Sequence, residues 1–90
     1  MECTITKDDL KIVLLKCVGS KYPTRIVCEN QEFKASYIRG FHDAECNFVT
    51  VSEREDLQDS NQIDLKTIVR IETVKVITYE RSRCRIFNVN

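Results

Sequence analysis

Apolar positions near the N-terminus repeat with the period of a helix. One apolar face results from residues at i, i+3, i+4 and i+7, namely Leu10, Val13, Leu14 and Cys17. Gly19 follows as a stop signal. Residues 11–18 are also compatible with a strand, because apolar side chains occur between these positions as well. The stop signal agrees with the helical period, so the pattern predicts a helix.

The start of this helix has its own signals. Thr6 is a residue type that caps helices, and Asp8 and Asp9 would lie in the first turn, where acids favour the positive end of the helix. With Thr6 as the cap, Ile5 and Leu10 occupy the positions of a hydrophobic staple. These signals predict that the helix begins just after Thr6.

Beyond Pro23 the period changes to the alternation of strands. Strands are expected over 24–30, 32–41 and 46–53, with a tight turn at 29–31 and a polar loop over 53–62. Residues 63–80 favour two strands or one long bent strand, and a turn at 81–83 leads to a last strand. In the second strand the alternation slips around Gly40, which predicts a bulge or sharp bend.

These elements predict a mainly β fold with one N-terminal helix. Without a second helix to cross between parallel strands, a single small, bent, mainly antiparallel sheet closing on itself suits the strand lengths. We expect one domain over 1–90 with a core at about 6–72 and an added hairpin at about 73–90. Seven residues are expected to be largely buried: Val13, Leu14, Ile26, Phe33, Phe48, Ile68 and Ile71.

Composition narrows the functional classes. Fourteen basic residues balance fourteen acidic ones, so no global field attracts nucleic acid or a membrane surface. No apolar run approaches the length of a membrane span, and the first residues carry acids before their apolar stretch, unlike a signal peptide. The sequence therefore predicts a cytoplasmic protein.

Cysteine and histidine usage gives little support for catalysis or metal binding. The five cysteines are odd in number and lack a C-x-x-C pair, so neither a disulfide framework nor a zinc site is predicted, and most are expected to be small buried apolar residues. A nucleophilic cysteine paired with His42, the single histidine, stays open. With no catalytic set and no phosphate loop, we expect neither an enzyme nor a cofactor.

Two short stretches resemble the Sm fold of Sm and LSm proteins. Asp43, Cys46 and Asn47 are similar to the family's first motif, an Asp, two residues, an apolar position and often an Asn. Residues 65–69 are similar to the second, an apolar residue, a basic one, a small one and a β-branched pair. The resemblance covers residues 6–72 and implies an N-terminal helix followed by a bent, five-stranded, SH3-like barrel.

The resemblance also implies a site. Asn47 and Lys66 would read an RNA base, with Asp43 fixing the Asn47 side chain or the turn. The position that stacks on the base is occupied here by Glu45, a poor partner for a phosphate-bearing ligand, and His42 or Phe41 could supply aromatic surface instead. The alternative is that Asp43 and Asn47 only clamp a loop.

A basic cluster near the C-terminus is the second candidate site. Cations and aromatic rings alternate there on an expected hairpin, with Arg81 and Arg83 projecting from its tip and Arg85 following. Such a surface suits single-stranded nucleic acid, but charged hairpin tips also serve as solvent-exposed turns that protect an edge strand.

We therefore expect a small non-enzymatic interaction module that binds a protein partner, and the alternative is an Sm-like protein that binds single-stranded RNA. The added hairpin would occupy the edge through which Sm subunits form rings, giving a monomer or a small homo-oligomer, or it would exchange between two chains. No membrane partner is expected.

Overall fold

A computed structural model describes residues 1–19, 21–42, 45 and 47–90. It confirms a mainly β fold with one short N-terminal helix. The elements, in chain order, are β1 (Glu2–Ile5), the 3-10 turn η1 (Lys7–Asp9), α1 (Leu10–Cys17), β2 (Thr24–Cys28), β3 (Glu32–Ala35), β4 (Tyr37–His42), β5 (Phe48–Ser52), β6 (Asn61–Asp64), the 3-10 turn η2 (Leu65–Thr67), β7 (Ile68–Tyr79) and β8 (Ser82–Val89). Within these ranges, no helix has the length and apolarity to traverse a bilayer.

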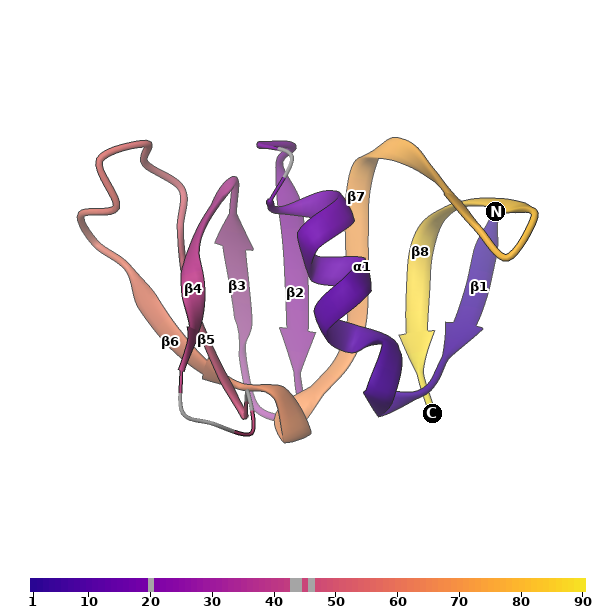
Figure 1. The fold of residues 1–90 in the computed structure, drawn as a ribbon, viewed down its shortest axis with the longest axis horizontal. Coiled ribbons are helices and arrows are strands. Elements are labelled where there is room, and N and C mark those ends of the chain that lie inside the picture. Colours follow the sequence, from indigo (N-terminus) through magenta and orange to yellow (C-terminus); the bar gives the residue numbers. More distant parts are fainter. Residues whose placement is uncertain (20, 43–44, 46) are drawn as a thin grey trace.

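The strands form two sheets. One has the order β1-β8-β7-β2-β3, the other β4-β5-β6, and α1 packs on one face of the first (Figure 1). Only Ser36 separates β3 from β4, and its amide donates to the Ser52 carbonyl (2.9 Å), so the chain changes sheet without a loop. Among the described strands no pairing joins β6 to β7, because η2 carries the chain back to the first sheet. The sheets are therefore not closed into a barrel.

The helix prediction is confirmed in type and in its buried face. Leu10, Val13, Leu14 and Cys17 are all buried, together with Ile5 of the expected staple. Its start is different, since η1 comes first and α1 begins at Leu10. Thr6 does not cap a backbone amide, because its hydroxyl donates to Asp9 Oδ2 (3.2 Å).

The stop at Gly19 has a steric reason. A Cβ at Gly19 would lie 2.6 Å from the Leu15 carbonyl oxygen, so only glycine lets the chain leave the helix here. The predicted slip in the second strand is also confirmed, since the β4–β5 register shifts between Ile38 and Gly40. Gly40 itself is not required, because a Cβ there would meet no atom within 4 Å.

Five of the seven predicted core residues are buried to 1% exposure or less, and two are not. Phe33 lies on β3, an edge strand of its sheet, so one flank of its side chain has no neighbouring strand. Phe48 is the first residue of β5, and it lies at the end of the pairing with β4 and of the pairing with β6. Both rings are therefore only partly buried, less than the other five residues of the predicted set.

The C-terminal hairpin differs from expectation in three respects. β7 is one strand of 12 residues that belongs to the core and to the hairpin together, after a separate β6. The turn consists of Glu80 and Arg81, both with positive φ (45° and 68°), the geometry of a two-residue hairpin turn. Arg83 consequently lies within β8 rather than at the tip.

Two features of the chain ends were not predicted. Residues 2–5 form a strand that pairs in parallel with β8, in the register Glu2 with Ile86 to Ile5 with Val89. A disulfide joins Cys3 to Cys84 across this pairing. Cys17 and Cys28 are buried thiols, as the sequence predicted for most cysteines, and Cys46 lies outside the described residues.

Candidate functional site

A pocket of about 390 Å³ lies where the start of α1 meets η2 and the segment before β5. We call it the lysine pocket, and its lining residues are Lys7, Asp8, Leu10, Lys11, Glu45, Asn47, Leu65 and Lys66. They come from three parts of the chain that are far apart in sequence. The lining includes three lysines, two acidic residues and two leucines, so the pocket has mixed charge.

Backbone hydrogen bonds hold η2 against the segment before β5. Asp64 caps η2, its Oδ1 accepting from the amide of Lys66 (2.9 Å). The amide of Leu65 donates to the Asn47 carbonyl (2.9 Å), which fixes Asn47 beside Lys66. The Lys7 ammonium donates to the Lys66 carbonyl (3.1 Å) and joins the helix side to η2. The pocket is thus tied together by contacts between all three parts.

The chemistry of the pocket depends on Glu45. Its Oε2 accepts a hydrogen bond from Asn47 Nδ2 (3.1 Å), so a carboxylate is bonded to the amide that the family resemblance assigns to base reading. On the other side, the Lys11 ammonium lies 5.2 Å from the centre of the Phe41 ring. The Lys66 ammonium has no hydrogen-bond or ion-pair partner among residues 1–19, 21–42, 45 and 47–90.

The structure brings Asn47 and Lys66 together, as the resemblance implies. Asp43 lies outside the described residues, so its predicted role as a clamp stays a prediction. His42, at the end of β4, hydrogen-bonds through Nε2 with the Thr50 hydroxyl and does not line the lysine pocket.

Neither described thiol is suited to act as a nucleophile with His42. Burial raises the pKa of Cys17 to about 11, and burial likewise raises the pKa of Cys28. Because the thiolate is the reactive form, burial disfavours the reactive form of both groups.

The basic cluster near the C-terminus, with Arg81, Arg83 and Arg85, is a separate surface. In Figure 1 the β7–β8 turn lies at the upper right and η2 at the bottom, well apart from each other. Arg81 is in the turn and Arg83 is exposed on β8. Arg85 Nε donates to the Thr73 carbonyl (3.5 Å) and lines a hollow of about 310 Å³ with Arg25, Lys34 and Val74 among others. The two predicted sites therefore do not combine.

Lys7 and Lys11 are site residues that the sequence did not indicate. Their spacing of four residues puts them on one side of a helical segment, which is a weak signal by itself. Their meeting with Lys66 depends on the tertiary fold, since the two segments are separated by more than half of the chain.

In the described ranges, no group of three or more His, Cys, Asp or Glu side chains is placed so that it could hold a metal ion. The lysine pocket instead brings together three lysines, two acidic residues and two leucines. Comparison with protein-family models, with curated proteins and with solved structures finds no match to this chain.

Proposed function

We propose that this chain is a small, non-enzymatic interaction module with an Sm-like fold, and that it binds a segment of a protein partner in the lysine pocket. The observation that carries the proposal is the Glu45 carboxylate, which lies in the pocket and accepts the Asn47 amide hydrogen. A negative charge at this point repels a phosphate backbone and occupies a donor that would read a base.

The pocket has the chemistry of a peptide site. The exposed Lys66 ammonium can bind a side-chain or terminal carboxylate, Lys7 and Lys11 add positive charge beside it, and Leu65 provides apolar contact. Asp8 can pair with a basic residue of the same peptide. We therefore expect a partner segment in which acidic residues flank an apolar one.

The order of the strands supports the Sm-like part of the proposal. A helix precedes β2, β3 and β4 follow one another as a single bent path, and η2 joins β6 to β7. β7 pairs with β2 along one edge and with β8 along the other. Ring closure through that second edge would require β8 to leave, so we propose a monomer or a small homo-oligomer. We propose the cytosol as its location.

Selection from a random-peptide phage library tests the proposal. We expect acidic–apolar peptides whose affinity falls about tenfold or more in Lys66→Gln, because one charge-assisted contact is removed. Lys34→Gln is the matched control, since Lys34 is also exposed but lies on β3, away from the lysine pocket. Equal effects of both substitutions would contradict the assigned site.

Single-stranded RNA is the alternative that must be measured alongside. Lys7, Lys11 and Lys66 could contact phosphates if the carboxylates did not oppose them. We expect no saturable binding of polyuridylate or polyadenylate at about 50 mM salt. If RNA binds at low salt, weakens steeply by about 200 mM salt and no longer binds Lys66→Gln, then the ligand of the lysine pocket is RNA and not a protein segment.

A further inference from the structure

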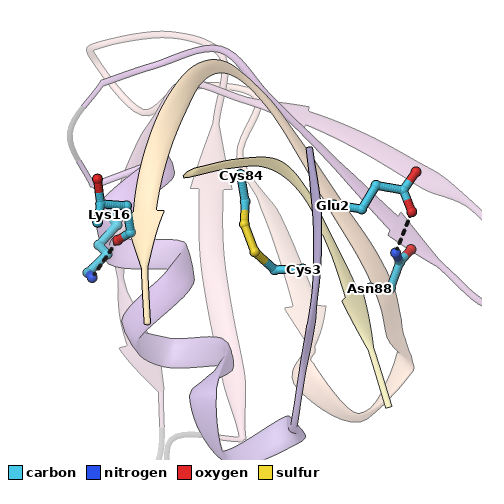
Figure 2. Close-up of a disulfide and its surroundings, with 6 residues drawn as sticks. Glu2, Cys3, Lys16, Cys84 and Asn88 are labelled. Atoms are coloured by element: carbon cyan, nitrogen blue, oxygen red, sulfur yellow. Dashed lines mark hydrogen bonds between the residues drawn. A yellow bond between two sulfur atoms is a disulfide. The ribbon is translucent and has the colours of Figure 1, made fainter. Parts of the chain in front are cut away.

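The Cys3–Cys84 disulfide joins the first strand of the chain to the last. The two residues are separated by 81 positions, and their Cα atoms lie 6.0 Å apart. Figure 2 shows the bond spanning from β1 to β8, with the Glu2–Asn88 hydrogen bond (3.0 Å) on the same pair of strands. β1 is an edge strand of four residues and pairs with β8 alone.

We propose that Cys3 and Cys84 form a reversible redox site, a latch that controls whether β1 stays on the edge of the sheet. The disulfide is the one covalent tie between β1 and β8. The remaining ties are the short parallel ladder, Ile5 in the core, and hydrogen bonds at both ends of the strand. A short strand paired along one edge opens locally at small cost, and the latch removes that opening.

The exchange uses low-molecular-weight thiols and disulfides. A thiolate attacks Sγ of Cys3, which is only partly buried, whereas Cys84 is fully buried. A mixed disulfide forms at Cys3, the Cys3–Cys84 bond breaks, and its electron pair leaves on Cys84 Sγ, which takes up a proton. A second thiolate attacks the small-molecule sulfur and frees Cys3. Two cysteine thiols and one small disulfide result, and oxidation is the reverse.

The site is selective because the other described cysteines cannot compete. Cys17 and Cys28 are buried, and burial raises the pKa of both thiols. Opening of β1 would leave the outer edge of β8 with unpaired amides and carbonyls, an edge that can accept another strand. The proposed cytosolic address favours this role, because cytosolic disulfides are mostly transient or redox-sensing. The latch does not depend on what the lysine pocket binds.

The test is a titration of the intact chain with reduced and oxidised glutathione, followed by alkylation, mass mapping and amide hydrogen exchange. We expect a single two-electron transition of Cys3 and Cys84, with Cys17 and Cys28 unmodified throughout. In the reduced form, amides of residues 2–5 and 86–89 should exchange about tenfold or more faster, while those of β2 and β5 keep their rates.

Two variants complete the test. Cys3→Ser should show the fast exchange in both buffers, and Cys28→Ala should respond like the wild type. Three outcomes would overturn the latch. They are unchanged exchange at β1 after reduction, faster exchange throughout the chain, and pairing of Cys3 or Cys84 with another cysteine.

Discussion

The hydroxyl of Tyr79 donates a hydrogen bond to Asp9 Oδ2 (2.6 Å) and joins the start of α1 to the end of β7. This bond is the main cause that lowers the pKa of Asp9 below 3.8, and it raises the pKa of Tyr79 to about 12 from 10.0. The bond thus favours the ionised carboxyl and the neutral phenol. Its partners lie 70 residues apart, so it contributes to the attachment of the helix to the hairpin.

The contribution of this bond to stability should depend on pH in a defined way. It is complete above pH 3.8 and is lost as the pH falls through the lowered pKa of Asp9. At the alkaline end it is complete below pH 10.0 and is lost as the pH rises through about 12. Urea unfolding across pH should show both losses in the wild type and in Tyr37→Phe. Tyr79→Phe should abolish the alkaline loss and reduce the acid loss, because the Thr6 hydrogen bonds to Asp9 and the lowered pKa of Glu32 remain. An unchanged profile in that variant would refute the assignment.

Among the elements, α1 offers a comparison between two adjacent leucines. Leu14 has 0% exposure and faces the sheet, whereas Leu15 is 45% exposed. Leu14→Ala should lower the free energy of unfolding by about 2–5 kcal/mol, because it leaves a cavity in the core. Leu15→Ala should change it by about 0.5 kcal/mol or less. Equal losses measured by denaturant unfolding would mean that α1 packs through another face.

The backbone of the β7–β8 turn is strained, and substitution can relieve this strain. Glu80 and Arg81 both adopt positive φ, which glycine and asparagine accept at lower cost. Replacing them together with Asn and Gly should raise the free energy of unfolding by about 1 kcal/mol. Peptide binding should be unaffected, because the turn is remote from the lysine pocket. A loss of peptide binding would instead mean that Arg81 is part of the binding site.

Local patterns in the sequence predicted the elements that depend on neighbouring residues. The helical face around Leu14, the strand alternation after Pro23 and the slip before Gly40 all follow from short-range periodicity. The parallel pairing of β1 with β8 and the Cys3–Cys84 bond could not be predicted, because both join the two ends of the chain and leave no periodic signal. The meeting of Lys7 with Lys66 is likewise tertiary, whereas Asn47 and Lys66 were indicated by a motif resemblance.

For the whole molecule, the occupied edges of β7 determine how copies can associate. Because β8 occupies the edge of β7 through which the proposed Sm-like fold would form rings, we expect sedimentation velocity to give the mass of one or two chains. The measurement should be made with the disulfide intact, since its reduction is proposed to free an edge of β8. A hexamer or heptamer under these conditions would contradict the proposal and favour the RNA-binding alternative.

The lysine pocket is proposed as the site for a protein segment. Chemical-shift mapping of the isotope-labelled chain with a library-selected acidic–apolar peptide tests it directly, with polyuridylate as the parallel titration. We expect the peptide to shift the amides of residues 7–11, 47 and 65–67, and polyuridylate to leave them in place. Peptide shifts confined to other surfaces, or shifts of these amides by polyuridylate alone, would contradict this proposal.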